Sequence, residues 1–304
     1  MYLHEQNREL FEEMIIAVAQ MVGVRTDIVE KDYYVTMILQ ELSKQELPVV
    51  FKGGTSLSKA YGVIDRFSED IDITFTEHLG ESRRKKLKYN VLKPIAEKLS
   101  LRIINWDSIE SDKDLNKYDF AYDSVIGNNN EAIPSFVRVE TSLMSYSFPI
   151  QECLISNYLY ESLKETQFEI LDKYSLFPFS MRVQSLERTL IDKLFAVCDY
   201  YLLGKSKKNA RHLYDIYKLE RHVSFDDNFK KLVNEVRGHR QLLGSRIAPA
   251  ADSNVDIRKL SKEICNSSFY KQDYNDTTLF LISDEISYED VIVKYLEVVK
   301  KVWK

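Results

Sequence analysis

The chain lacks the features of a membrane protein or of a disulfide-stabilised one. Its 304 residues include only three cysteines, which are far apart and form no Cys-x-x-Cys pair, so neither a disulfide framework nor a zinc site is expected. No apolar run reaches the roughly 18–20 residues needed to span a bilayer. The N-terminus places acidic residues ahead of a short apolar run and has no small-residue cleavage signal. We therefore expect a cytoplasmic protein without a membrane partner, whose cysteines stay reduced.

An excess of positive charge is also missing. The formal net charge is −5, so any contact with nucleic acid must come from local basic clusters rather than from the overall field. Lys205, Lys207, Lys208 and Arg211 form one such cluster, which could steer a phosphate backbone. With 44% hydrophobic residues the chain can bury a sizeable core, and it is long enough for two domains.

The most informative stretch of the chain begins with a glycine pair. Gly53, Gly54, Thr55 and Ser56 follow an apolar run and start a predicted helix. Because nothing projects from the glycines, such a turn can bring backbone N–H groups and hydroxyls up to phosphate oxygens. These four residues are candidates for binding a nucleoside triphosphate, although a glycine pair after a strand is also typical of a simple tight turn.

Two acids follow on a predicted strand. Asp70 and Asp72 alternate with apolar residues, so both carboxylates point to the same face, ~7 Å apart. Such a pair is also typical of the solvated face of a sheet. Asp is nevertheless a poor strand former, and like charges on one face repel unless a cation lies between them. Mg²⁺ takes such oxygen ligands, and a pair of Mg²⁺ ions is typical of phosphoryl transfer.

A third acid is expected from a neighbouring strand. In residues 135–143 the apolar Val137 and Val139 share one face, while Arg138 and Glu140 share the other. Glu140 is the candidate third metal ligand. The alternative is a solvated glutamate beside Arg138.

These residues resemble the nucleotidyltransferase superfamily, whose members share a Gly-Gly/Ser turn, a helix, an Asp-x-Asp strand and a third acid. The segments GGTSLSKAY and RFSEDIDI resemble more narrowly the AbiEii/AbiGii family of toxin-like nucleotidyltransferases. That family also carries Glu-Lys-Asp-Tyr near the N-terminus, a helical Lys and an Arg-x-Leu-Tyr-Asp segment, which are matched here by Glu30 to Tyr33, by Lys193 and by Arg211 to Asp215. Many members have an acid directly after the Arg, where this chain has His212.

The resemblance implies a fold and a biological role. The fold would be α+β, with a DNA polymerase beta-like mixed sheet and helices, followed by a C-terminal helical bundle. The protein would be the toxin of a type IV toxin–antitoxin or abortive-infection system, with a cognate antitoxin as partner. It would use an NTP to modify a tRNA 3′ end, another RNA or a protein hydroxyl.

Lys193 can be identified without the family. It falls within the helical stripe that Leu186, Leu190 and Leu194 set, so it should face inward. A lysine is almost never buried unpaired, so Lys193 needs an anion, which could be Asp72, Asp215 or a triphosphate. Snorkelling of its amine to the surface is the alternative.

We therefore predict transfer of a nucleoside monophosphate from an NTP to a hydroxyl. Asp70 and Asp72 would coordinate two Mg²⁺ ions, Glu140 would hold the ion nearest the acceptor, and Lys193 would neutralise the leaving pyrophosphate. Asp215 would orient Lys193 or assist deprotonation of the acceptor, although an ion pair with Arg211 four residues earlier is also possible. The rival interpretations are a non-catalytic module that binds GTP or another NTP and acts through protein interaction, and an enzyme that modifies a small molecule such as an aminoglycoside.

The periodicity of the chain predicts two domains. Residues 1–185 would form the nucleotidyltransferase domain with leading helices, and residues 186–304 a helical domain that carries the Lys and Asp motifs. Helices are expected at 5–21, 26–43, 55–61 and 81–99, and strands near 48–52, 70–75, 101–106, 118–124 and 136–143. Further helices are expected at 207–222, 226–242, 256–265 and 287–302. Gly238 to Asn254 is expected to be an exposed loop.

Overall fold

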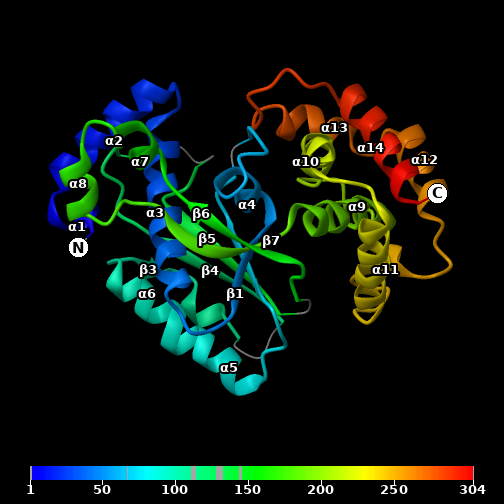
Figure 1. Ribbon diagram of the computed structural model, residues 1–304, viewed down its shortest axis with the longest axis horizontal. Coiled ribbons are helices and arrows are strands. Elements are labelled where there is room, and N and C mark those ends of the chain that lie inside the picture. The colour runs from blue at the N-terminus through cyan, green and yellow to red at the C-terminus, as the bar shows by residue number, and fades with distance from the viewer. Residues whose placement is uncertain (1, 67, 111–113, 128–132, 144–145, 304) are drawn as a thin grey trace. The chain divides into compact units, whose positions relative to one another are not determined.

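The computed structural model describes residues 2–66, 68–110, 114–127, 133–143 and 146–303 (Figure 1). The chain divides into two compact units. The first comprises Met1–Tyr61 and Ser68–Val183, and the second comprises Gly62–Phe67 and Gln184–Lys304. The boundary at 183/184 lies two residues from the one expected at 185/186. The short stretch 62–67 was not expected to group with the C-terminal unit.

A mixed sheet forms the centre of the first unit. Its strand order is β3-β4-β5-β2-β1-β7-β6. β1 pairs antiparallel with β2 and parallel with β7, β2 pairs parallel with β5, and β4 pairs antiparallel with both β3 and β5. The strands are β1 Val49–Lys52, β2 Ile71–Phe75, β3 Arg102–Ile103, β4 Leu115–Ala121, β5 Phe136–Ser142, β6 Ile150–Ile155 and β7 Phe179–Gln184.

Helices accompany this sheet. The expected helix over 81–99 is helical throughout, but a π-helical turn at Leu87–Leu92 separates two α-helical parts. Asn7 caps α2 by accepting from the Leu10 N–H, which satisfies one of the unpaired donors at that helix start. The helices are α1 Leu3–Gln6, α2 Arg8–Val22, α3 Thr26–Ser43, α4 Gly53–Lys59, α5 Glu81–Lys86, α6 Lys93–Lys98, α7 Tyr158–Leu163 and α8 Phe168–Lys173, with a 3₁₀ turn at Trp106–Ser108.

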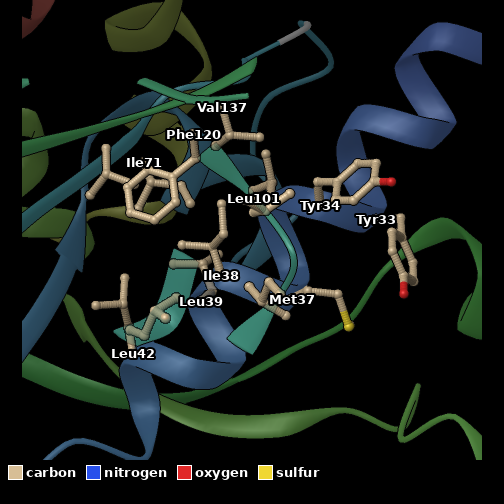
Figure 2. Packing of buried hydrophobic residues seen from close by; sticks show 14 of the residues in the cluster. Tyr33, Tyr34, Met37, Ile38, Leu39, Leu42, Ile71, Leu101, Phe120 and Val137 are labelled. Carbon is tan, nitrogen blue, oxygen red and sulfur yellow. The ribbon is translucent and has the colours of Figure 1, made fainter. Parts of the chain in front are cut away.

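The main core of the first unit lies between α3 and one face of the sheet. Figure 2 shows Ile38, Leu39 and Leu42 of α3 beside sheet residues such as Ile71 and Phe120. All five side chains are at most 1% exposed, and full burial of one such side chain contributes about 1.5–3 kcal/mol. Since side chains alternate along a strand, the residues between these buried positions lie on the opposite face of the sheet.

The second unit is almost entirely helical, as expected. Ser185 caps α9 by accepting from the Arg188 N–H, and Ser287 forms a capping box at the start of α14. The helices are α9 Leu186–Leu202, α10 Arg211–Leu219, α11 Asp227–Gln241, α12 Ile257–Ser267, α13 Lys271–Asp273 and α14 Tyr288–Val302, with a π-helical turn at Tyr274–Thr278 and 3₁₀ turns at Glu220–His222 and Pro249–Ala251. None of the described helices in either unit is long and apolar enough to cross a bilayer.

The expectation of an exposed loop from Gly238 to Asn254 is wrong in part. α11 ends at Gln241, as the helix expected at 226–242 implies, and Ala248, Ala250 and Ala251 are buried. The reason is a hydrogen bond from the Ala250 N–H to the Asp199 carboxylate, at 2.7 Å. That bond ties the polar stretch to α9, a long-range contact that local composition does not reveal.

Candidate functional site

Four charged residues form a row across four neighbouring strands of the sheet. Lys52 at the end of β1 is the register partner of Asp72 in β2, Asp72 is the partner of Glu140 in β5, and Glu140 is the partner of Lys117 in β4. Directly opposed residues point to the same face of a sheet with their Cβ atoms about 5 Å apart. The order of charges is therefore plus, minus, minus, plus, with the two carboxylates adjacent at its centre.

Glu140 and Lys117 are also joined by an ion pair. The Lys117 Nζ donates to Glu140 Oε1 at 2.6 Å, with Lys117 half exposed and Glu140 half buried. The pair neutralises one of the two adjacent acids. Because Lys117 is exposed to solvent, the pair contributes at most about 1 kcal/mol, and another cation can replace Lys117 at Glu140.

The glycine turn lies directly against one of these acids. Gly53 has a φ of +79°, and a Cβ added to it would overlap the Asp72 carboxylate. This position requires glycine for two reasons, the left-handed backbone and the close approach of the acid. The turn and the Asp-x-Asp strand thus form one site, although Gly53 and Asp70 are seventeen residues apart in sequence.

The hydroxyls after the glycines are engaged within the protein. Thr55 Oγ1 donates to the Asp70 carbonyl and lies 2.9 Å from the Ser68 hydroxyl, and Ser56 Oγ donates to the Gly53 carbonyl at 2.9 Å. Thr55 and Ser56 are buried. In this arrangement both side chains stabilise the turn, and the groups that remain for a phosphate are the backbone of Gly53 and Gly54.

Asp70 lies immediately before β2, where the chain enters the sheet. The neighbouring cation is Arg138 in β5, which donates to the carboxylate of Asp119 at 2.7 and 2.9 Å. The hydrogen bonds to Asp119 raise the pKa of Arg138, and the charges of Asp70 and Glu140 raise it further. Arg138 is therefore close to the acids, but its bidentate partner is Asp119 rather than Glu140, the neighbour considered from sequence.

Asp72 and Glu140 are adjacent on neighbouring strands, and Asp70 lies two residues before Asp72, just ahead of β2. Within the described ranges, no three carboxylate, imidazole or thiolate groups are close enough together to hold a metal ion by themselves. Mg²⁺ is commonly held by one or two carboxylates, and waters and substrate phosphates complete its shell. The donors present fit an ion that arrives with a nucleotide, rather than a site closed by protein ligands alone.

A second charged cluster lies within the C-terminal unit. Lys193 on α9 donates to Asp215 Oδ2 on α10 at 2.6 Å, and Arg66 donates to both Asp215 oxygens at 2.7 and 2.9 Å. The side chains of Asp215, Arg66 and Lys193 are 0%, 2% and 8% exposed. Lys193 is thus inward-facing, as its place in the apolar stripe predicted, and Asp215 is its partner among the anions that we considered.

The protonation states of this cluster follow from two opposing effects. Burial would raise the pKa of Asp215, but the charges of Arg66 and Lys193 outweigh it and hold that pKa far below its usual range. Burial lowers the pKa of Lys193, and the charge of Asp215 compensates only in part. Asp215 therefore stays ionised, and its two oxygens accept from Lys193 and Arg66.

Two cations of the site were not among the sequence candidates. Lys52 and Lys117 flank the acids only because of the register between strands that are distant in sequence. Lys52 carries a local signal, since it directly precedes the glycine pair. Lys117 has none, because its pairing with Glu140 depends on the β4–β5 register.

A mixed sheet that carries a glycine turn beside adjacent acids defines the nucleotidyltransferase class of α+β folds. MenT4, a nucleotidyltransferase toxin from Mycobacterium tuberculosis H37Rv, has a similar structure: the TM-score is 0.50 at 16% sequence identity, over 95% of this chain and 89% of that chain. No curated protein matches the sequence. The chain belongs to the AbiEii family, described as the nucleotidyl transferase AbiEii toxin of type IV toxin–antitoxin systems, whose sequence model matches residues 38–291.

Proposed function

We propose that this member of the AbiEii toxin family transfers a nucleoside monophosphate from an NTP to a hydroxyl acceptor and releases pyrophosphate. The observation that carries the proposal is the charged row, in which Asp72 and Glu140 are register partners and Gly53 lies against Asp72. Two adjacent like charges destabilise a sheet. Their placement beside the bare backbone of Gly53 and Gly54 fits a cation and an anion that both come with the substrate.

Asp70, Asp72 and Glu140 would hold Mg²⁺, one ion or the pair expected from sequence. When bound, the metal would stabilise the charge that develops on the α-phosphate and on the leaving pyrophosphate. Gly53 and Gly54 would present backbone N–H groups to the β- and γ-phosphates. Phosphate contacts from Thr55 and Ser56 remain a prediction, since they would require their hydroxyls to leave the internal bonds described above.

Lys52 provides a further positive charge beside the acids. It is half buried at the end of β1, directly opposite Asp72 and next to the first glycine. A lysine so placed can act as a point charge for a phosphate. The assignment of charge neutralisation to Lys193, with Asp215 as its orienting partner, remains a prediction for the second unit.

The acceptor would be an RNA, with a tRNA 3′ end as the first candidate, or a protein hydroxyl. Family membership supports this choice together with a cognate antitoxin and action in the cytoplasm. Lys205, Lys207 and Lys208 are exposed between α9 and α10 and provide a local basic patch on a chain of negative net charge. Such a patch can contact a phosphate backbone in spite of the overall charge.

The test is transfer of label from each of four α-labelled NTPs to total cell RNA and protein. Asp72→Asn should abolish transfer and toxicity while the circular dichroism spectrum and melting temperature stay unchanged. Asp107→Asn, which removes an exposed acid of the same unit, should leave both activities intact. Full retention of transfer in Asp72→Asn would refute the assignment. Calorimetric binding of Mg·NTP by the wild type without any transfer would instead support the non-catalytic NTP-binding module.

A further inference from the structure

Three consecutive charged residues on one turn of α3 reach three different parts of the first unit. Glu30, Lys31 and Asp32 are buried or nearly so, yet each ends in polar contacts far away in sequence. Nothing in the catalytic proposal uses them. They belong to the Glu-Lys-Asp-Tyr segment, for which the sequence interpretation assigned no role.

Lys31 makes the contacts that matter most for the acids. Its Nζ donates to the Pro134 carbonyl at 3.0 Å, forms an ion pair with Glu69, and lies 5.6 Å from the centre of the Phe136 ring. The Lys31 side chain is 2% exposed and that of Glu69 is 28% exposed. Since a buried ammonium without partners costs several kcal/mol, these contacts are required of the folded protein.

The partners of Lys31 lie where the two acid-bearing strands begin. Glu69 directly precedes Asp70 and the start of β2, and Pro134 and Phe136 lead into β5. Because β2 and β5 are parallel neighbours, both strands start at the same edge of the sheet. One ammonium group therefore connects the start of the Asp-x-Asp strand to the start of the Glu140 strand.

The neighbouring charges act on other segments around the same edge. Asp32 accepts from the Lys59 Nζ on α4 at 2.6 Å and from the Tyr158 N–H at 3.0 Å. Glu30 accepts from the Ser124 hydroxyl at 2.6 Å and from the Val125 N–H at 2.8 Å, beyond β4. The same helical turn thus also attaches the helix that carries the glycine pair.

We propose that Lys31 is a positioning residue for nucleotidyl transfer. It fixes the position of Asp70 and Asp72 relative to Glu140 along the two parallel strands. The inference rests on the proposed function for its catalytic consequence. It predicts that loss of Lys31 affects metal binding and the chemical step, because the acids move, and spares triphosphate binding, because the glycine turn is held separately through Asp32 and Lys59.

The experiment compares Lys31→Met with two further variants. Glu69→Gln breaks the same ion pair from its half-exposed side, so it tests the idea even if Lys31→Met does not fold. Lys88→Met is the matched control, because Lys88 is also a buried lysine that donates to a backbone carbonyl, that of Ile109, and lies 4.6 Å from the Trp106 ring. Unlike Lys31, it contacts neither acid-bearing strand in these interactions.

Four quantities should be measured on each full-length variant: kcat, KM for the NTP, Mn²⁺ affinity by electron paramagnetic resonance, and amide hydrogen exchange. We expect Lys31→Met to lower kcat and Mn²⁺ affinity by about 10–100-fold, as for other groups that orient metal ligands. At saturating Mg²⁺ the KM for the NTP should change by less than about twofold, since the glycine turn is held separately through Asp32 and Lys59. Exchange should accelerate at residues 69–72 and 136–138. Glu69→Gln should act in the same direction, and combining it with Lys31→Met should add nothing further.

Other results would overturn the inference. Equal losses in Lys31→Met and Lys88→Met, an unchanged kcat with faster exchange, or additive effects of Lys31→Met and Glu69→Gln would each show a purely structural lysine. If the wild type binds Mn²⁺ but transfers nothing, the proposed function fails, and the Mn²⁺ affinities of the variants still decide the role of Lys31. If the wild type binds Mn²⁺ neither alone nor together with an NTP, the inference fails as well.

Discussion

Substitution of Gly53 by alanine tests whether the glycine turn and the acids form one site. The new methyl group meets a left-handed backbone, with φ +79°, and the Asp72 carboxylate. The backbone term costs about 1–2 kcal/mol of folding free energy for a residue other than glycine. The overlap with Asp72 can be relieved only if the carboxylate is displaced. A displacement of about 1 Å in a catalytic group can lower the rate about a hundredfold.

Gly23→Ala separates the effect of the left-handed backbone from that of the overlap with Asp72. Gly23 ends α2 with φ +69°, and a Cβ there would meet nothing within 4 Å. Gly23→Ala should therefore lose about 1–2 kcal/mol of unfolding free energy in urea denaturation, and Gly53→Ala at least as much. Only Gly53→Ala should also lose about a hundredfold in kcat for transfer from an α-labelled NTP. Equal activities of the two variants at equal folded fractions would refute the reasoning, because the contact between Gly53 and Asp72 would then have no part in the chemistry.

Two further predictions concern the charged clusters. Asp215→Asn should destabilise the protein by about 3–5 kcal/mol, because it leaves buried cations such as Lys193 uncompensated. The low folded pKa of Asp215 means that its stabilising contribution is complete above the unfolded pKa of about 3.9 and is lost progressively as the pH falls below it. The free energy of unfolding, measured by urea denaturation, should thus fall more steeply from pH 7 to pH 3 for the wild type than for Asp215→Asn. Parallel pH dependences of the two proteins would contradict the assignment. Lys117→Met should tighten Mn²⁺ binding about two- to fivefold, since Lys117 competes with the metal for Glu140 through an ion pair of at most about 1 kcal/mol. Weaker binding in a Mn²⁺ titration would contradict this competition.

Local patterns in the sequence were sufficient for most helices and for the acid-bearing strands. The alternation around Asp72 and Glu140 predicted that each would share a face with its polar neighbours, and both lie on strands as expected. The apolar stripe of α9 predicted the inward position of Lys193. In each case the signal is periodic and lies within one element, so no long-range information was needed.

The remaining features depend on contacts between distant segments. β6 and β7 were not predicted: β6 is a largely exposed edge strand without buried alternation, and β7 pairs with β1, which is distant in sequence. The pairing of Glu140 with Lys117 needs the register of β4 on β5, and a slip of one residue would place Lys117 on the other face. The bidentate bond of Arg66 to Asp215 spans 149 residues, a separation at which local periodicity carries no information.

The assignment of residues 62–67 to the helical unit has a consequence for how this gene can be divided. Arg66 and Asp65 are bonded to Asp215 and Lys218 of that unit, although they lie between the glycine turn and the Asp-x-Asp strand in sequence. A fragment that ends at residue 185 would expose Arg66 without its carboxylate partner, and a fragment that begins at 186 would lack Arg66 altogether. Exchange of the helical unit between relatives by recombination would therefore need a compensating change inside the motif itself, so the two parts should be inherited together.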